Sequence, residues 1–413
     1  MEFGLIGEHL GHSYSPEIHA AFAPYRYELR ELAPEELEDF FRAREFRGIN
    51  VTIPYKQAVI PLLDEVDGAA RRIGAVNTVV NRGGKLLGYN TDYSGMRALL
   101  EYRHIDLAGK KVLILGTGGT SKTAHAAAED LGAAQILHVS RTGKDGALTY
   151  AAAQREHRDA QVILNTTPVG MYPDTEGEPI DLSAFPALTG AADVIYNPLR
   201  TNFVLDALDR GIPAAGGLYM LAAQAVCASA LFLGKEAEPE QIEDAYRAVV
   251  RQKRAIALIG MPTSGKTSVG RLLAARTGKK LIDTDAEIVR RIGMPIPVFF
   301  RQRGEAAFRV IEHEITAWAS EQEGVVIATG GGAVLNDDNV RTLRRSGVTV
   351  FLDRPLEKLL ASADRPLSGT REDLELRYRE RYDRYRAAAD FTVDGGGSIE
   401  ETARRVTEVL EQL

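Results

Sequence analysis

The sequence has very little cysteine. Cys227 is the only cysteine in 413 residues, which excludes a disulfide framework and any metal site built from a cysteine cluster, and suits a reducing compartment. Uninterrupted apolar stretches of the ~18 residues that a membrane span needs are also missing. The first residues, MEFGLIGEHLGHSYSP, have neither the basic nor the apolar segment of a signal peptide. We therefore expect a cytoplasmic protein with no membrane partner.

An excess of positive charge is missing too. The formal net charge is −7, which argues against a general nucleic-acid binder. About 26% of the residues are charged and 45% are hydrophobic, a composition typical of globular proteins. At roughly 100–200 residues per domain, a chain of this length is expected to form two to four domains.

What the sequence does contain is two distant signals of the same kind: an apolar strand, a glycine turn and a helical pattern. They are KVLILGTGGTSK, ending at Lys122, and AIALIGMPTSGKT, at 255–267. Further strands are predicted at 136–139, 162–164 and 193–196, and after the second turn at 325–328 and 348–353. Alternating strands and helices predict an α/β fold with parallel sheets, and we place the boundary near residue 252.

The first glycine turn has the geometry of a dinucleotide site. Gly116, Gly118 and Gly119 follow a strand and open an Ala-rich helix, so that backbone amides can approach a pyrophosphate at the helix N-terminus. The next strand ends in Arg141, where an NAD site would usually have Asp or Glu. A cation there suits the ribose 2′-phosphate of NADP. The contacts predicted around this phosphate are Ser140, Arg141, Thr142 and Lys144.

Residues 1–95 form a separate α/β lobe with several short polar strings. These are HSYSP, NVTIPYK, GAVNT and GYNTD, and a polyhydroxylated substrate needs many short donors and acceptors of this kind. Lys56 and Asp92 would form an acid–base pair for hydride transfer between a ketone and an alcohol, in which the carboxylate orients the ammonium and the ammonium passes a proton to oxygen. Taken singly, such residues are more often turn or surface residues.

Together these strings resemble shikimate dehydrogenase over residues 1 to about 250. HSYSPEIH, NVTIPYK, GAVNTV, GYNTDYSG, GTGGTSK, SRT, YNP and GLYMLAAQA occur in the order of that family. The resemblance makes Lys56 the catalytic lysine and places Val194 and Gly217 beside the nicotinamide of NADPH. It implies that shikimate is bound by Ser13, Ser15, Thr52, Asn77, Asp92, Tyr196 and Gln224. The late glycine motif departs from the usual GLGML in carrying Tyr219.

The second glycine turn matches the phosphate-loop pattern GxxxxGK[ST] completely. Its backbone amides cradle phosphates, Lys266 reaches the β- and γ-phosphate oxygens of ATP, and the Thr267 hydroxyl is a ligand of Mg²⁺. The predicted ATP contacts within this segment are Gly260, Thr263, Ser264, Gly265, Lys266, Thr267 and Ser268.

Polar residues further along suggest the acceptor of the phosphate. Asp283 and Asp285 follow a strand, where one assists Mg²⁺ and the other binds a substrate hydroxyl. Arg309 and Glu312 lie one helical turn apart, and three glycines follow the strand at 325–328.

These features resemble shikimate kinase over about 254–413. IDTD, GEAAFRVIE, ATGGGAV, DRPL and the RERYDRY helix occur in family order, and Thr263 stands where the family usually has glycine. The resemblance places Asp283 near Mg²⁺ and Arg365 over the ATP phosphates. It also implies that shikimate is held by Asp285, Arg309, Gly331 and Arg381.

We therefore interpret the chain as a bifunctional enzyme of the shikimate pathway, which leads to chorismate and the aromatic amino acids. It reduces 3-dehydroshikimate to shikimate with NADPH and phosphorylates shikimate with MgATP. The predicted domains are a substrate lobe at 1–95 with returning helices at about 218–250, a Rossmann-type NADP domain at 96–217, and a P-loop kinase domain at 253–413. We expect a monomer or homodimer. The alternative is an NAD-preferring quinate/shikimate dehydrogenase fused to a kinase domain that only binds nucleotide.

Overall fold

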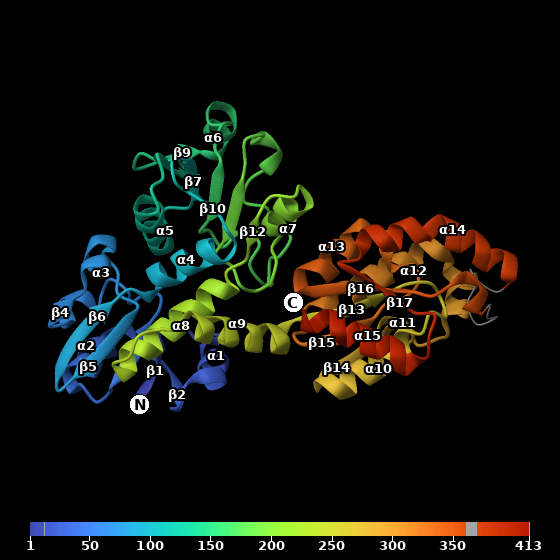
Figure 1. Cartoon of the computed structure of the whole chain (residues 1–413), viewed down its shortest axis with the longest axis horizontal. Coiled ribbons are helices and arrows are strands. Elements are labelled where there is room, and N and C mark those ends of the chain that lie inside the picture. The colour runs from blue at the N-terminus through green and yellow to red at the C-terminus, as the bar shows by residue number, and fades with distance from the viewer. Residues whose placement is uncertain (12, 361–369, 413) are drawn as a thin grey trace. The chain divides into compact units, whose positions relative to one another are not determined.

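The computed structural model describes residues 1–11, 13–360 and 370–412 (Figure 1). The chain divides into two compact units, Met1–Val250 and Arg251–Leu413. Both are built from strands and helices around mostly parallel sheets, so the predicted α/β fold is confirmed. No helix in the described ranges is both long enough and apolar enough to span a membrane.

The first lobe of the N-terminal unit is a mixed six-stranded sheet in the order β2-β1-β3-β5-β6-β4. Parallel pairs join β1, β2 and β3, whereas β5 pairs antiparallel with both β3 and β6. The strands are β1 Phe3–Gly7, β2 Tyr27–Glu31, β3 Gly48–Val51, β4 Glu65–Val66, β5 Thr78–Arg82 and β6 Lys85–Tyr89. The helices are α1 Ser15–Phe22, α2 Leu37–Ala43 and α3 Gly68–Ile73, with 3₁₀ turns at Pro34–Glu36 and Ile60–Leu62.

The second lobe is an entirely parallel sheet in the order β12-β11-β10-β7-β8-β9. Its strands are β7 Lys111–Leu115, β8 Gln135–Ser140, β9 Leu148–Thr149, β10 Val162–Asn165, β11 Gly190–Asp193 and β12 Ala214–Ala215. Its helices are α5 Gly119–Asp130, α6 Tyr150–Glu156 and α7 Asn202–Asp209, with a 3₁₀ turn at Leu182–Ala184. Strand β7, near the middle of the sheet, is apolar along almost its whole length because helices cover both faces of a parallel sheet.

The strand predicted at 193–196 is wrong by three residues, because β11 ends at Asp193. The Asp193 side chain accepts a hydrogen bond from the Ile195 amide, 3.0 Å away. This short hydrogen-bonded turn directs the chain out of the sheet immediately after the strand.

Two long helices join the lobes. Helix α4 (Thr91–Tyr102) leads from the first sheet to the second, and α8 (Leu218–Leu233) returns and packs along it (Figure 1). The sequence of α8, LYMLAAQAVCASALFL, is apolar on nearly every side, as expected for a helix buried among neighbours. Helix α9 (Pro239–Lys253) follows. The two helices place polar residues of both lobes around one space.

The C-terminal unit is a five-stranded parallel sheet in the order β14-β15-β13-β16-β17. Its strands are β13 Ala255–Ile259, β14 Lys280–Asp283, β15 Val325–Ala328, β16 Gly347–Asp353 and β17 Phe391–Asp394. Its helices are α10 Lys266–Thr277, α11 Thr284–Ile292, α12 Ile296–Ser320, α13 Asp337–Ser346, α14 Arg371–Ala388 and α15 Ile399–Glu411. Short 3₁₀ turns lie at Ala333–Leu335 and Leu356–Lys358. Helix α12 is kinked at Gly304, whose φ of 79° is not helical.

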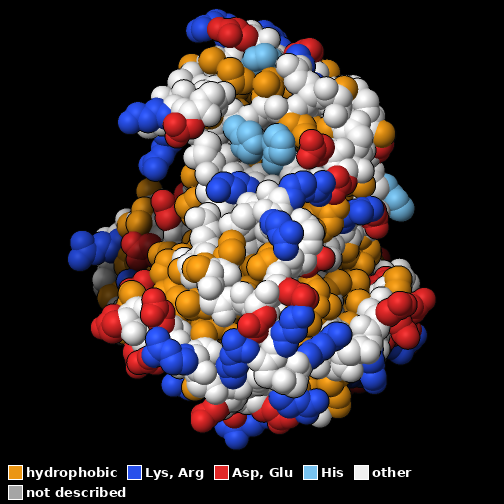
Figure 2. All heavy atoms as spheres, turned by 90° about the vertical axis from the view of Figure 1, so that its left-hand side faces the viewer, with side chains coloured by type: hydrophobic (Ala, Val, Ile, Leu, Met, Phe, Trp, Pro, Cys, Tyr) orange, Lys and Arg blue, Asp and Glu red, His pale blue; other side chains and the backbone are white. Residues whose placement is uncertain are grey.

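The surface carries charges of both signs. On the face shown in Figure 2, Lys and Arg side chains are interspersed with Asp and Glu side chains instead of gathering into one basic field. This arrangement agrees with the net charge of −7.

Candidate active sites

A cavity of about 210 Å³ lies in the N-terminal unit, lined by both lobes and by α8. It brings together residues that are far apart in the sequence and that the sequence analysis grouped. They are Ser13, Ser15, Thr52, Lys56, Asn77, Asp92, Val194, Tyr196, Gly217 and Gln224. His12 falls outside the described residues.

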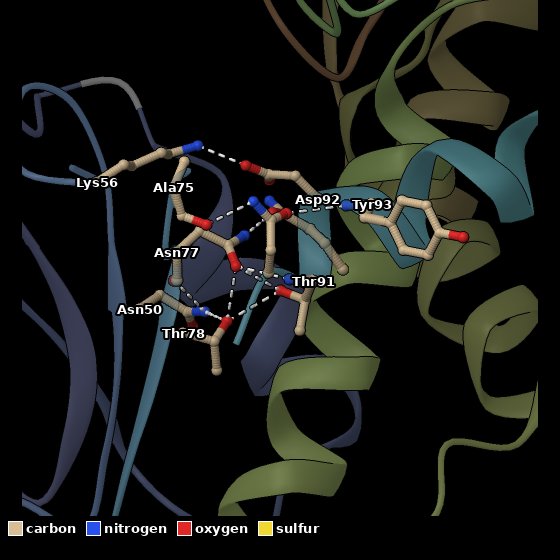
Figure 3. Close-up of polar contacts among 10 residues, drawn as sticks. Asn50, Lys56, Ala75, Asn77, Thr78, Thr91, Asp92 and Tyr93 are labelled. Carbon is tan, nitrogen blue, oxygen red and sulfur yellow. Dashed lines mark hydrogen bonds and ion pairs between the residues drawn. The ribbon is translucent and has the colours of Figure 1, made fainter. Parts of the chain in front are cut away.

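Lys56 and Asp92 face each other at this cavity. Lys56 Nζ lies 2.6 Å from Asp92 Oδ2, and their side chains are 26% and 11% exposed (Figure 3). Lys56 lies in the turn after β3, and Asp92 stands in the first turn of α4, where the helix dipole favours a carboxylate. Lys56 is therefore a charged donor that Asp92 holds in place beside the cavity.

Asn77 is locked by its neighbours. Its Oδ1 accepts hydrogen bonds from the Thr91 amide at 2.7 Å and from Thr78 Oγ1 at 3.1 Å (Figure 3). These donors orient the amide so that Nδ2 points the other way, to Gln224 Oε1 at 3.1 Å. Gln224 comes from α8, so this bond joins a loop of the first sheet to the returning helix.

The two serines begin α1. The Ser15 amide donates to Ser13 Oγ at 3.2 Å, and Ser15 is the first residue of the helix. Between them, Tyr14 packs its ring 5.0 Å from the ring of Tyr196. This contact places Tyr196 beside the two serines in the wall of the cavity.

Val194 and Gly217 form another part of the cavity wall. A Cβ atom on Gly217 would lie 2.1 Å from the Val194 carbonyl oxygen, so this close approach requires glycine. Tyr219 stacks on Tyr102 with ring centroids 3.9 Å apart and also packs against Tyr246. Its ring therefore contacts α4 and α9 and is not among the residues that line the cavity.

The first glycine turn is open where a dinucleotide would approach. Gly116 has a φ of 109°, and hypothetical Cβ atoms on Gly118 and Gly119 would meet nothing within 4 Å. Gly118 and Gly119 start α5, whose first amides have no intrahelical partner. After β8, Arg141, Thr142 and Lys144 are exposed, and the Ser140 hydroxyl accepts a hydrogen bond from the Gly143 amide.

The phosphate loop of the C-terminal unit wraps around Lys266. Lys266 Nζ donates to the carbonyls of Gly260 and Met261, both at 2.9 Å. Among the described residues, the buried Ser264 hydroxyl has no hydrogen-bond partner, an arrangement that a phosphate oxygen would satisfy. Gly265 N-caps α10, and Ser268 is exposed on its first turn.

Thr267 and Asp283 meet beside this loop. Thr267 Oγ1 donates to Asp283 Oδ2 at 2.6 Å, which brings a hydroxyl and a carboxylate oxygen to one point. Such oxygens are the ligands that Mg²⁺ prefers, with water and phosphate completing its shell. In the described part of the chain no cluster of three or more His, Cys, Asp or Glu residues could hold a metal ion.

Thr263 has a φ of 64°, which is strained for a β-branched residue. Its hydroxyl donates to the Leu360 carbonyl and accepts from the Leu360 amide, both at 3.1 Å. These bonds hold the strained residue in place. Arg365, predicted to lie over the phosphates, falls outside the described residues.

A second group of polar residues surrounds the glycines after β15. Arg309 Nη1 lies 2.6 Å from Glu312 Oε2, and the latter carboxylate is buried. Asp285 reaches the same place from α11, because a Cβ atom on Gly330 would lie 2.8 Å from both carboxylates. The pKa of Glu312 is raised, because burial outweighs the lowering effect of Arg309 and Arg381.

Arg381 reaches these glycines from α14. Its Nη1 donates to the Gly331 carbonyl at 3.1 Å, and the Tyr385 hydroxyl donates to the same oxygen. Arg381 is itself buried. Asp285, Arg309, Gly331 and Arg381, which the sequence analysis grouped, therefore converge near the phosphate loop.

Comparisons with known proteins identify both units. Residues 5–79 match the model "Shikimate dehydrogenase substrate binding domain", and residues 262–411 match "Shikimate kinase". A shikimate dehydrogenase (NADP(+)) of Clostridium perfringens is 36% identical over 262 residues, which are 59% of this chain and 96% of that protein. The chain belongs to the shikimate dehydrogenase family. Its C-terminal unit carries a shikimate kinase domain.

Solved structures agree for the dehydrogenase part. A shikimate 5-dehydrogenase of Thermus thermophilus, in complex with NADP(H) and shikimate, is 33% identical, with a TM-score of 0.54 over 60% of this chain and 98% of its own. A quinate dehydrogenase of Corynebacterium glutamicum, in complex with NAD, is 29% identical, with a TM-score of 0.54 over 60% of this chain and 98% of its own.

Several residues of the shikimate dehydrogenase cavity were missed in the sequence. His19, Asn50 and Thr120 line it. His19 lies one helical turn after Ser15 in α1, and Asn50 starts the NVTIPYK string, so both carried a signal. In the shikimate kinase domain, Tyr385 was missed as a partner of Gly331, since its position on a strongly charged helix gave no sign of burial.

Proposed function

We propose that the N-terminal unit reduces 3-dehydroshikimate to shikimate with NADPH, and that the C-terminal unit phosphorylates the 3-hydroxyl of shikimate with MgATP. The observation that carries the first activity is the Lys56–Asp92 pair, 2.6 Å apart at the cavity. The convergence of Arg309, Asp285 and Arg381 beside a phosphate loop carries the second. The product of one site is the substrate of the other, which gives the fusion a metabolic purpose.

In the dehydrogenase site NADPH supplies a hydride to the carbonyl carbon of the substrate. Lys56 donates a proton to the carbonyl oxygen, so that the ketone becomes an alcohol, and Asp92 keeps the ammonium in place. Asn77 and Gln224 present a fixed donor and acceptor to ring hydroxyls, while Ser13 and Ser15 offer hydroxyls from the start of α1. These roles follow from the hydrogen-bond chemistry of each side chain.

The choice of NADPH depends on Arg141. Arg141 and Lys144 are exposed beyond β8, close to where an adenosine ribose lies in a Rossmann-type site. A guanidinium binds a 2′-phosphate with two parallel hydrogen bonds, whereas NAD offers it only hydroxyls. This favours NADPH over the alternative of an NAD-dependent quinate/shikimate dehydrogenase.

In the kinase site ATP supplies the phosphoryl group, and Mg²⁺ would be held by Thr267 and Asp283. Lys266 neutralises charge on the phosphates, and Ser264 offers its unpartnered hydroxyl to them. Arg309 and Arg381 bind the acceptor carboxylate, and Asp285 accepts from a ring hydroxyl. The role of the kinase domain as a purely nucleotide-binding module is disfavoured because both the phosphate loop and the acceptor residues are present.

The experiment that tests both activities is a coupled assay with the purified full chain. 3-Dehydroshikimate and NADPH are supplied first, and NADPH oxidation and shikimate are measured. MgATP is then added, and shikimate 3-phosphate and ADP are measured. Shikimate formation without phosphorylation would reject the kinase proposal alone, and faster turnover with NADH would reject the NADPH proposal.

A further inference from the structure

Two buried polar side chains end neighbouring strands in the centre of the second sheet. The register of β10 and β11 places Asn165 opposite Asp193, and both residues are fully buried. Asn165 Nδ2 donates to Asp193 Oδ1 at 3.1 Å. Neither residue lines the cavity. A carboxylate buried in a sheet is destabilising unless hydrogen bonds compensate it, so its partners indicate its role.

Asp193 accepts hydrogen bonds from three segments. Besides Asn165, Ile195 N donates to Oδ1 at 3.0 Å, and Thr201 Oγ1 donates to Oδ2 at 2.6 Å. Thr201 in turn caps α7. The pKa of Asp193 is raised to about 7, because burial raises it by more than the three hydrogen bonds lower it. The carboxylate therefore links the ends of two strands to the start of a helix.

Asn165 is itself fixed in orientation. Its Oδ1 accepts from the Thr167 amide at 3.0 Å and from Thr167 Oγ1 at 2.7 Å. The amide nitrogen must then point to Asp193. The rigid Asn165 side chain thus fixes the position of Asp193 Oδ1.

The bond to Ile195 controls a turn that forms the cavity wall. The Ile195 carbonyl accepts from the Gly217 amide at 2.7 Å, and the Val194 carbonyl lies against the Gly217 Cα. Val194 and Gly217 both line the cavity. The conformation of the turn at 193–195 therefore sets the position of the start of α8, and with it one wall of the site.

We propose that Asp193 is a positioning residue for hydride transfer: through the turn at 193–195 and Gly217, its carboxylate fixes the wall against which the nicotinamide of the cofactor lies. The proposal rests on the proposed dehydrogenase function. Asp193 does not touch the reacting atoms. It acts by holding Val194 and Gly217 in position. A displacement of the nicotinamide ring by a fraction of an ångström is enough to slow the chemical step.

A series of substitutions in the full chain separates this role from general stability. Asp193→Asn keeps an oxygen for the Ile195 amide but replaces the acceptor of the Thr201 hydroxyl with an NH2 donor. Asp193→Ser keeps a weaker acceptor, a hydroxyl on a shorter side chain, for the same amide. Asp193→Ala has no side-chain acceptor. Asp181→Ala is the matched control, because Asp181 also accepts from an amide two residues on, that of Ser183, but it is exposed and does not line the cavity.

Four quantities are measured for each variant: kcat and KM with NADPH, the kinetic isotope effect with NADPH deuterated at the transferred position, and the Kd of 2′,5′-ADP. The last compound carries the 2′-phosphate but no nicotinamide. We expect kcat to fall in the order Asn, Ser, Ala, by about ten-fold or more at Ala. We expect the isotope effect to rise in that order, and 2′,5′-ADP binding to stay within about two-fold of the unmodified protein.

Equal kcat in all folded variants would overturn the proposal, as would a loss of 2′,5′-ADP binding parallel to the loss of kcat. If the Ala variant does not fold, the Asn and Ser variants decide in the same way. Failure of the proposed function looks different, because the unmodified protein would then be inactive with NADPH and 3-dehydroshikimate. Kinase activity is measured in every variant and should not change.

Discussion

Lys56 Nζ lies 2.6 Å from Asp92 Oδ2, although 35 residues separate them in the sequence. The lysine comes from the turn after β3 and the aspartate from the first turn of α4. Hydrogen bonds of Thr91, at the start of α4, to Asn77 and Thr78 of the first lobe help to bring the two together, beside a cavity that polar residues of both lobes line. This pair is the part of the structure on which the dehydrogenase proposal depends most directly.

Lys56→Ala should lower the dehydrogenase kcat by roughly 10²–10⁴, the usual effect of losing a positioned acid–base group. Kinase activity should persist in the same protein, because its phosphate loop lies in the other unit. Lys85→Ala is the control, since Lys85 forms an exposed ion pair with Glu65 away from the cavity. Normal reduction of 3-dehydroshikimate by the Lys56 variant would show that another group donates the proton.

Arg141→Ala should weaken NADPH binding far more than NADH binding. Loss of a charge-assisted hydrogen bond of ~1.5–3 kcal/mol corresponds to about a ten- to hundred-fold higher Kd. Fluorescence titration with both cofactors measures the difference, and Arg155→Ala, an exposed residue on α6, serves as control. An equal loss for both cofactors would assign Arg141 a structural role.

Arg309→Lys should impair the kinase nearly as much as Arg309→Ala. A carboxylate is held best by a planar guanidinium, which lysine cannot reproduce. Misplacing shikimate impairs both binding and orientation, so KM should rise and kcat should fall. Two titrations, with shikimate and with ATP, test this on the Lys variant. Normal shikimate affinity would refute the assignment, and a selective loss of ATP binding would place Arg309 on the phosphates.

Arg290→Lys provides the matched control for that experiment. Arg290 lies on α11 and pairs with Glu287 in an i,i+3 arrangement, as Arg309 does with Glu312. Its side chain is 70% exposed, whereas that of Arg309 is 23% exposed. An exchange of arginine for lysine should therefore be almost neutral there.

Asp130 should contribute to stability in a pH-dependent way. Hydrogen bonds from Arg72 and Tyr93 lower its pKa to about 2, below the value of about 3.9 in an unfolded chain. The ionised form is therefore favoured by folding, and its contribution is present above pH 4 and is lost as the pH falls towards 2. Because the pair is partly exposed, we expect a contribution of only about 1 kcal/mol or less.

Urea unfolding of Asp130→Asn and of the unmodified protein measures this contribution. The difference in unfolding free energy should be largest at pH 6–7 and should shrink below pH 4. Arg72→Ala should show the same difference at pH 7, and the double variant should be no less stable than either single one. A difference that stayed constant with pH would contradict the assigned ionisation.

Local sequence was enough to predict the parts that depend on local geometry. The GxxxxGK[ST] spacing predicted a phosphate loop between a strand and a helix, and the structure has Gly265 capping α10 after β13. The alternation of apolar strands and helices predicted parallel sheets, which follows because a strand–helix–strand unit has few ways to bury its apolar surface. The order of short polar strings indicated the families that the comparisons then identified.

Tertiary structure decided what depends on distant contacts. The strand predicted to continue to residue 196 stops at Asp193, because a buried carboxylate binds the amide two residues on. Tyr219 turns to Tyr102, and Gly331 receives both Arg381 and Tyr385 from α14. Nothing in the local pattern fixes these partners, because side-chain direction and burial are set by elements that lie tens to hundreds of residues away in the chain.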